Sequence, residues 1–309
     1  AAYIAVVGCY SQTGYRALAK IPGIDLILGN HDKMNVLDYI GDATKSETPV
    51  IVRERIDRKD FSLHIVGEEP YHERANLKIQ DGCDFFCSFC IIPFARGHAR
   101  SRDWDNLVEE AQNLAQRGVK ELVLTGVNLG TYHKENRGIV DIVDRLHEIP
   151  GIRRVRISSI EPTTIPESLF PRMADPEHTL MPFLHIPLQS GCDQTLRAMQ
   201  RKYSLQEYMD FIELAKSQVP DLILGTDILV GFPGETEENF EESCESFLHS
   251  SLNFCHVFTY SERQGTPAAK SKDSIPIPER KRRSAHLRRL SAKKRYDYYS
   301  EYVGKELNV

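Results

Sequence analysis

Short apolar runs alternate with amphipathic segments along most of the chain. The runs have the length and β-branched content of strands in a parallel sheet, and the segments between them repeat apolar residues every three to four positions, as helices do. The pattern predicts strands at 75–79, 121–125, 155–157, 183–186, 222–229 and 254–258, and helices at 106–117, 140–148, 166–173, 205–217 and 237–250. Six strand–helix repeats are too few for an eight-fold barrel. The sequence therefore predicts a partial (β/α)6 barrel of TIM type or an open parallel sheet.

A smaller α/β unit precedes this repeat. Apolar runs at 3–7 and 24–28 are each followed by a helix-like segment. Residues 41–74 are polar and charge-rich and contain two prolines, which is typical of a linker, here with one or two strands. We expect three parts: the C-terminal part of a truncated, flavodoxin-like α/β domain with its linker, the barrel, and a terminal basic helix. Their ranges are 1–70, 71–278 and 279–309.

Polar or glycine-rich turns follow five of the predicted barrel strands. They are Gly82-Cys83, residues 126–128, Ser158-Ser159 with Glu161, residues 187–191 and residues 231–235. Glycine and serine are ordinary in any one turn. In barrels and open parallel sheets, however, ligands bind at the C-terminal ends of the strands. Five such turns at one rim therefore predict a ligand site there.

Composition excludes several classes of protein. No stretch approaches the roughly 18 uninterrupted apolar residues that a membrane helix needs, and no secretory signal opens the chain. The seven cysteines are an odd number, and three of them lie between residues 83 and 90. This distribution does not fit a secreted disulfide framework. We expect a soluble, cytoplasmic protein with no membrane partner.

Charge is unevenly distributed along the chain. With 39 Lys and Arg against 44 Asp and Glu, the net charge of -5 argues against a simple basic nucleic-acid binder. Residues 280–295 nevertheless carry nine basic residues and no acidic one, which leaves 30 (39 minus 9) basic against 44 acidic residues elsewhere. This segment lies in a predicted helix at 278–302, whose end holds four tyrosines. A solvated terminal helix and a phosphate-contacting surface both fit the pattern.

Cys83, Cys87 and Cys90 form a CxxxCxxC motif directly after the first barrel strand. Thiolates favour zinc or iron–sulfur clusters over hard cations. A structural zinc ion needs a fourth ligand, for which His98 is a candidate, and the chain would then be a non-catalytic, zinc-stabilised RNA-binding module. Three cysteines on a cluster would instead leave one iron open to a substrate or cofactor. Ligand chemistry alone leaves both alternatives open.

The motif, with Phe89 just before its third cysteine, resembles the signature of radical S-adenosylmethionine (SAM) enzymes, whose fold is a six-fold partial barrel. Further stretches resemble the methylthiotransferase branch of that superfamily: residues 78–83 (KIQDGC), 91–97 (IIPFARG), 124–126 (LTG), 185–191 (HIPLQSG), 228–236 (ILVGFPGET) and 260–268 (YSERQGTPA). Within the branch, residues 91–97 and 156–162 are most similar to the MtaB type and less similar to the MiaB and RimO types.

The resemblance implies a function. Enzymes of the MtaB type add a methylthio group to C2 of N6-threonylcarbamoyladenosine at position 37 of tRNA. Alternatives within the branch are isopentenyladenosine at position 37 and an aspartate of a ribosomal protein. The implied partners are the tRNA anticodon stem-loop, a low-potential electron donor such as flavodoxin or ferredoxin, and a sulfur source.

The resemblance also implies roles for individual residues. Cys83, Cys87 and Cys90 would hold a 4Fe–4S cluster that binds and reductively cleaves SAM. Phe89 would pack near the adenine of SAM, and Gly126 would let its methionine end approach the backbone. The polar candidates for its ribose and carboxylate are Ser158, Glu161, Gln189 and Arg201.

A second, auxiliary 4Fe–4S cluster is implied as well, held by three cysteines of the N-terminal domain. Residues 6–12 (VVGCYSQ) match the segment that bears the third of these cysteines, so Cys9 is the expected ligand. Cys192, Cys244 and Cys255 match no such motif. Either the other two ligands lie upstream of Ala1 or the auxiliary cluster is incomplete. The resemblance also implies a small RNA-binding β-barrel, the TRAM domain, which would begin where this sequence ends.

Overall fold

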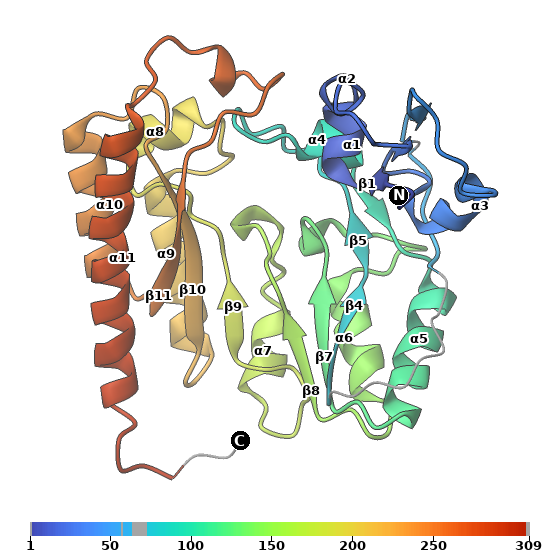
Figure 1. The fold of residues 1–309 in the computed structure, drawn as a ribbon. Coiled ribbons are helices and arrows are strands. Elements are labelled where there is room, and N and C mark those ends of the chain that lie inside the picture. The colour runs from blue at the N-terminus through green and yellow to red at the C-terminus, as the bar shows by residue number, and fades with distance from the viewer. Residues whose placement is uncertain (1, 57, 64–72, 307–309) are drawn as a thin grey trace.

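The computed structural model describes residues 2–56, 58–63 and 73–306. It contains a small N-terminal α/β unit beside a larger arc of strands and helices (Figure 1). Among the described helices, none is both long and apolar enough to cross a membrane.

The N-terminal unit is a parallel sheet in the order β1-β2-β3, with β2 completely buried. The strands are β1 (Ala5–Val7), β2 (Leu26–Leu28) and β3 (Val50–Val52). The helices are α1 (Cys9–Thr13), α2 (Tyr15–Leu18), the 3-10 turn η1 (Lys33–Asn35) and α3 (Val36–Ile40). β3 falls within the segment expected as a linker with strands, and it continues the sheet of the first two strands.

Six parallel strands form the arc. They make two hydrogen-bonded groups, β4-β7-β8 and β9-β10-β11. Val155 of β8 joins the groups, because its N–H donates to Thr179 O over 2.7 Å and its carbonyl accepts from Met181 N over 2.9 Å. The strands are β4 (Arg74–Lys78), β7 (Glu121–Thr125), β8 (Arg154–Ile157), β9 (Phe183–His185), β10 (Ile223–Val230) and β11 (Phe254–Thr259). The predicted partial (β/α)6 fold is confirmed, as an open arc whose strands lie within one residue of their predicted ends.

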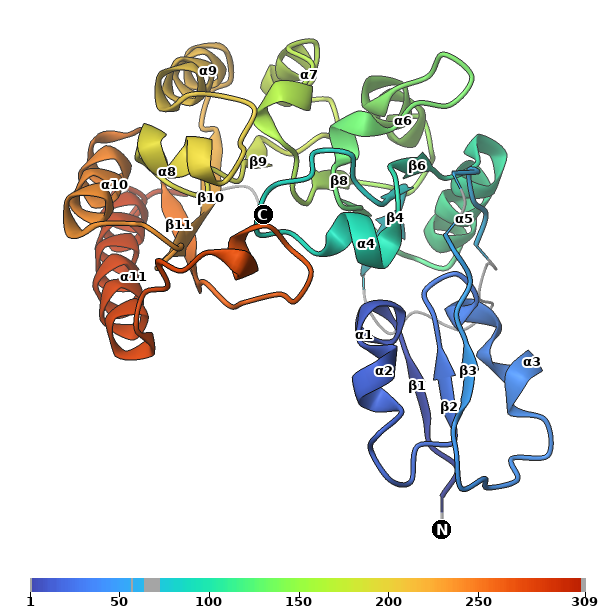
Figure 2. The same ribbon diagram turned by 90° about the horizontal axis from the view of Figure 1, so that it is seen from above.

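Helices cover the convex outside of the arc (Figure 2). They are α5 (Trp104–Gln116), α6 (Ile139–His147), α7 (Leu169–Ala174), α9 (Leu205–Gln218), α10 (Glu237–His249) and α11 (Ile277–Ser300). Side-chain caps fix three of their starts: Asp103 accepts from Asn106 N, Ser204 from Glu207 N and Thr236 from Asn239 N. The predicted helix at 166–173 begins later than expected, at Leu169, because residues 167–168 form a turn.

Short elements complete the rim and were not predicted. They are β5 (Gln80–Asp81), which pairs antiparallel with β6 (Arg100–Ser101), α4 (Ile92–Arg96), α8 (Asp193–Ala198) and the 3-10 turns η2 (Leu129–Thr131), η3 (Pro162–Thr164) and η4 (Ala268–Lys270). Elements of two to six residues are too short to show a period, so the hydrophobic pattern does not detect them.

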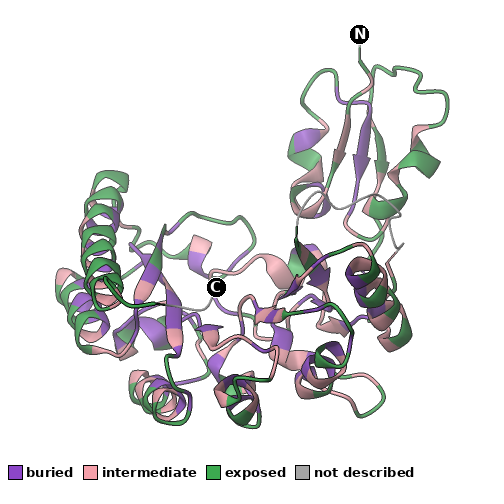
Figure 3. Cartoon of the chain, turned by 90° about the horizontal axis from the view of Figure 1, so that it is seen from below, coloured by how far each residue is buried: buried purple, intermediate pink, exposed green. Residues whose placement is uncertain are grey.

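Successive strand residues point to opposite sides of the arc. One set is apolar and packs in a continuous core beneath the outer helices, including Leu77, Leu124, Val155, Leu184 and Leu224, all completely buried. Buried residues gather on the strands, and exposed residues on the outer faces of the helices (Figure 3). The other set faces the inside of the arc and includes Arg156, His185, Asp227 and His256, which makes the lumen polar.

α11 closes the free edge of the sheet. Leu287 is completely buried in the core, and the Ser291 hydroxyl bonds both backbone groups of Cys255 on β11, accepting from its N–H at 2.9 Å and donating to its carbonyl at 2.8 Å. Unpaired edges of sheets tend to recruit other strands. The helix predicted at 278–302 is therefore confirmed, and part of its role is to cover this edge.

Candidate functional site

The cysteine loop begins at Gly82, which has a positive φ of 75°. A Cβ there would lie 1.9 Å from the carbonyl oxygen of His98, so a side chain cannot be accommodated. The adjacent Cys83 N–H donates to Gly97 O over 3.1 Å. The start of the loop is thus fixed against the segment that follows α4.

Ser88 anchors the middle of the loop to the other half of the arc. Its N–H donates to Met199 O over 3.0 Å, its hydroxyl donates to Ala198 O over 2.8 Å, and its carbonyl accepts from Ala268 N over 2.9 Å. The loop therefore spans the rim from β4 to the far side of the barrel. Sequence analysis did not single out Ser88, because a serine between two cysteines carries no signal of its own.

The three thiols lie close enough to influence one another. Cys87 is buried, whereas Cys83 and Cys90 are partly exposed. Burial raises the pKa of Cys83 to about 11 and also raises the pKa of Cys90, and in both cases a neighbouring thiol and Glu161 add to the effect. Soft thiols of this kind lose their protons when they bind iron or zinc, because the positive charge of the metal stabilises the thiolates. The donor set fits an iron–sulfur cluster.

His98 does not complete a zinc site. Its Nδ1 atom bonds the Asp84 carboxylate, and its Nε2 atom lies 2.9 Å from Nη2 of Arg58. Within residues 2–56, 58–63 and 73–306, no group of three or more His, Cys, Asp or Glu side chains is close enough to hold a single metal ion. His98, the candidate fourth ligand of a zinc site, is therefore bonded to other side chains.

Two of the predicted polar residues meet the cysteine loop. The buried guanidinium of Arg201 donates from Nη1 to the Sγ atom of Cys87 over 3.2 Å and from Nη2 to the Glu161 carboxylate. Tyr203, which sequence analysis missed, orients this guanidinium, because its hydroxyl accepts from Nε at 3.0 Å and donates to Pro187 O at 2.7 Å. Burial raises the pKa of Glu161, and Arg201 opposes the rise. The result is a buried pair of opposite charges beside the thiols.

Phe89, Ser158 and Gln189 lie at the same rim without meeting this pair. The ring of Phe89 packs edge-on to Phe232, with centroids 6.5 Å apart, in an apolar cluster that includes Met199. Ser158 follows β8 and donates its N–H to Leu124 O. Gln189 has a positive φ of 72°, and its N–H donates to Asp227 O over 2.8 Å, which extends the pairing beyond β9.

Gly126 packs against Gln80, a completely buried residue that sequence analysis missed. The Gln80 amide accepts from the N–H groups of Val127 and Asn128 at 2.8 and 2.9 Å and donates to Gly82 O at 2.8 Å. A Cβ on Gly126 would lie 3.0 Å from the Gln80 Oε1 atom. Gln80 thus ties the cysteine loop to the turn after β7, and the absence of a side chain at Gly126 makes room for it.

The inside of the arc contains a cavity of about 520 Å³, which we call the lumen cavity. It is lined by Arg74, Val123, Arg156, Ser158, Ser159, Phe183, His185, Asp227, His256 and Phe258. His185 Nε2 lies 2.9 Å from Asp227 Oδ1, and the rings of His185 and His256 are 5.3 Å apart. Apart from Ser158 and Ser159, sequence analysis did not select these residues. The polar ones on the strands, such as Arg156, His185 and Asp227, did leave a signal in the sequence, because they interrupt otherwise apolar strands.

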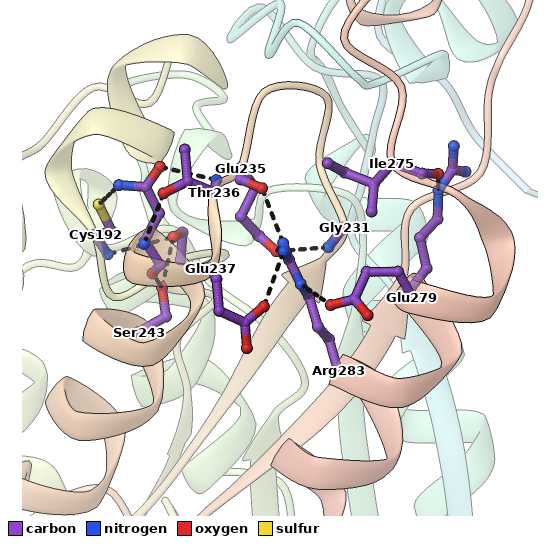
Figure 4. A network of polar contacts seen from close by, with 12 residues as sticks. Cys192, Gly231, Glu235, Thr236, Glu237, Ser243, Ile275, Glu279 and Arg283 are labelled. Atoms are coloured by element: carbon purple, nitrogen blue, oxygen red, sulfur yellow. Dashed lines mark hydrogen bonds and ion pairs between the residues drawn. The ribbon is translucent and has the colours of Figure 1, made fainter.

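The turn at 231–235, one of the five expected at the ligand rim, is held by a structural ion pair (Figure 4). Glu235 accepts from Gly231 N at 2.9 Å and from Nη1 of Arg283 at 2.6 Å, and both side chains are about 95% buried. Arg283 also contacts Glu237 and Glu279. The Glu235 side chain thus joins α11 to the turn at 231–235.

Cys9 lies at the start of α1 and is partly exposed. Asn30 links it to the barrel, because its Nδ2 atom is 3.5 Å from the Cys9 Sγ atom and donates to Ala95 O of α4 over 2.7 Å. α4 begins two residues after Cys90, so the N-terminal unit brings Cys9 to the side of the rim that bears the cysteine loop. Cys192, Cys244 and Cys255 are buried in the barrel.

Comparison with known proteins identifies the family. Residues 77–247 match the radical SAM superfamily. The chain is 36% identical to the threonylcarbamoyladenosine tRNA methylthiotransferase MtaB of Bacillus subtilis, over 99% of this chain and 68% of that protein. It is 35% identical to the MtaB of Aquifex aeolicus, over 100% of this chain and 75% of that protein. The chain belongs to the MtaB family of radical SAM methylthiotransferases.

This assignment confirms the resemblance on which the expected cofactors rest. Radical SAM enzymes use a 4Fe–4S cluster and SAM. The solved structure of the radical SAM methyltransferase TsrM from Kitasatospora setae has the same fold, with a TM-score of 0.55 and 17% identity, over 69% of this chain and 42% of that chain. The chain therefore combines the barrel fold of the radical SAM superfamily with the cysteine motif of that superfamily.

Proposed function

We propose that this MtaB family chain is a tRNA methylthiotransferase that modifies C2 of N6-threonylcarbamoyladenosine at position 37. The observation that carries the proposal is the CxxxCxxC loop beside the buried Arg201–Glu161 pair, in a chain that matches two MtaB enzymes over nearly its whole length. The proposed substrate is that of these two relatives, both threonylcarbamoyladenosine tRNA methylthiotransferases. The barrel, the cysteine loop and the lumen cavity supply a site for it.

Cys83, Cys87 and Cys90 would hold the 4Fe–4S cluster. When bound, the cluster and SAM supply the one-electron chemistry that activates a C–H bond. The residues of the chain hold the cluster and SAM in position and shield them from water. Arg201 places a fixed positive charge against Cys87, which offsets the negative charge of three thiolates, and Ser88 and Gln80 fix the loop from two sides. The candidates for contacts with SAM remain Phe89, Gly126, Ser158, Glu161, Gln189 and Arg201.

The lumen cavity is the proposed place of the modified base. Its volume of about 520 Å³ lies within the range of roughly 300–1,000 Å³ typical of small-ligand pockets. An enzyme that acts on a base carbon must take the base out of its stack, and loop bases are more readily extruded than paired ones. The polar side chains of His185, Asp227 and Arg156 offer hydrogen bonds to the extruded base and its substituent.

Cys9 is the proposed ligand of an auxiliary cluster, with two further cysteine ligands expected outside this sequence. Its position beside α4 supports the proposal, because a sulfur donor must reach a substrate held near the cysteine loop. A low-potential electron donor such as flavodoxin or ferredoxin and a sulfur source complete the proposed partners, and a cytoplasmic location fits a tRNA-modifying enzyme. We also propose the domain division 1–70, 71–278 and 279–309.

Mass spectrometry of tRNA nucleosides tests the function. The full-length enzyme, purified anaerobically with its clusters, is incubated with SAM, a reductant and tRNA that bears threonylcarbamoyladenosine, isopentenyladenosine or unmodified adenosine at position 37. The methylthio product is expected from the first tRNA alone. A product from isopentenyladenosine alone would reassign the substrate, and no product from any tRNA would overturn the proposal. Zinc without iron in the protein would favour the RNA-binding alternative.

A further inference from the structure

A second cavity lies on the outer edge of β11, between this strand and α11, and has a volume of about 430 Å³. We call it the α11 groove. It is lined by Cys255, His256, Val257, Phe258, Arg288, Ser291, Ala292 and Arg295. His256 and Phe258 also line the lumen cavity, so the groove and the lumen adjoin across the edge strand.

The groove carries positive charge that the fold does not neutralise. Arg288 and Arg295 are seven residues apart, which places them on one face of α11, separated by about 10 Å along its axis. Both are exposed. Arg288 donates from Nη2 to Val257 O over 3.1 Å, and within the described chain Arg295 has no hydrogen-bond or ion-pair partner. No acidic residue is among the described residues that line the groove.

Three other basic residues of α11 differ in this respect. Arg280 and Arg283 are buried and bond acidic side chains, and Lys294 donates to the carbonyls of Phe247 and Ser250. These three side chains stabilise the fold. α11 therefore carries two kinds of basic residue. The buried ones stabilise the fold, and the exposed ones of the groove are available to an anionic partner.

The groove also offers an aromatic side chain. Phe258 is 53% exposed, although it lies on a barrel strand, and it borders both cavities. Nucleobases stack on exposed aromatic rings of this kind, while neighbouring basic side chains hold the phosphates. The arrangement suits a nucleic-acid strand that crosses the edge of the barrel with one base turned inward.

We propose that the α11 groove binds the phosphodiester backbone of the tRNA beside the nucleotide whose base enters the lumen cavity. Arg288 and Arg295 contact the phosphates, and Phe258 stacks on a neighbouring base. The inference rests on the proposed function, because it requires an RNA substrate. It adds the path by which the strand reaches the site and the residues that hold it there.

Affinity for an anticodon stem-loop tests the groove. Binding of the full-length holoenzyme is measured by fluorescence anisotropy for the double variant Arg288→Gln/Arg295→Gln and for a matched control, Lys281→Gln/Lys293→Gln. The control removes two exposed charges from the same helix outside the groove. We expect a loss of at least tenfold for the groove variant and threefold or less for the control. Circular dichroism and iron content show whether each variant is folded.

The salt dependence of binding sharpens the test. Two lost phosphate contacts lower the slope of log K against log salt by about 1.4, at roughly 0.7 per contact for a single strand. Phe258→Ala should weaken binding without changing this slope. Unchanged affinity in the groove variant, or equal losses in both double variants, would overturn the inference. If the wild-type enzyme still methylthiolates tRNA in that case, the proposed function stands, and if it modifies no tRNA, the function itself fails.

Discussion

Arg201 donates a hydrogen bond from Nη1 to the Sγ atom of Cys87 over 3.2 Å and thereby joins two residues 114 positions apart in the sequence. The same guanidinium bonds the Glu161 carboxylate, and its side chain is only 3% exposed. One buried cation therefore connects the cysteine loop, the turn after β8 and the segment after α8. The charge balance of the site depends on it.

Replacing Arg201 by methionine should lower the free energy of unfolding by about 3–5 kcal/mol, because the Glu161 carboxylate would stay buried without its partner. Urea denaturation followed by circular dichroism measures the loss. The exposed Arg197 of α8 provides the control, and Arg197→Met should change the stability by no more than about 0.5 kcal/mol.

A second replacement identifies the cause of this loss. Glu161→Gln removes the unpaired charge, so the double variant Arg201→Met/Glu161→Gln should recover part of the lost stability. Equal stability of Arg201→Met and Arg197→Met would contradict the role of the ion pair.

Replacing Cys87 by alanine should abolish cluster binding at the CxxxCxxC motif. The variant is expected to lose the iron and the visible absorption of this cluster, to keep those of the auxiliary cluster, and to form no 5′-deoxyadenosine from SAM. Cys244→Ala is the matched control, since it removes a buried thiol from α10, far from the motif in sequence, and should keep its iron. Iron content and SAM cleavage at the wild-type level in Cys87→Ala would refute the assignment of the motif.

The barrel could be predicted because its strands and helices are long enough to display their periods. The site could be predicted only in part. The motif indicated the three cysteines, and the resemblance nominated Glu161 and Arg201, but a contact between residues 114 positions apart leaves no local trace. Gln80 and Ser88 act through hydrogen bonds to distant backbone groups, for which the sequence around them carries no signal.

The basic helix shows the same limit. Its charge run predicted a surface for phosphate, yet Arg280, Arg283 and Lys294 are held within the protein. Their acceptors come from other elements, such as Glu262, Glu235 and the carbonyl of Phe247. A charge pattern records which residues are basic but not which of them face an acceptor. The structure shows that Arg288 and Arg295 are exposed and line the α11 groove, unlike these three residues.

Loss of Arg283 should destabilise the protein far more than loss of its neighbour Arg282. Arg283 is buried against Glu235, so Arg283→Met leaves a buried carboxylate unpaired and should cost about 3–5 kcal/mol. The side chain of Arg282 is 51% exposed, and its ion pairs lie at the surface, so Arg282→Met should cost about 0–1 kcal/mol. Both values come from urea denaturation. Similar losses in the two variants would show that the Glu235–Arg283 pair does not anchor α11.

Lys294 should make stability depend on alkaline pH. Burial lowers its pKa to about 8, and the groups that face it are Cys255 of β11 and Lys216 and Glu213 of α9. In the unfolded chain its pKa is about 10.4. Between these two values the unfolded state binds more protons than the folded state, so raising the pH favours folding.

The free energy of unfolding of the wild type, minus that of Lys294→Met, should therefore rise between about pH 8 and pH 10 and stay flat below pH 7. Groups common to both proteins cancel in this difference. Lys293→Met, which removes the exposed neighbouring lysine, should give a flat difference over the whole range. Urea denaturation at pH 7, 8, 9 and 10 measures all three proteins. A difference for Lys294→Met that is flat or falls above pH 8 would mean that the ammonium group is not desolvated between α11 and the end of α10.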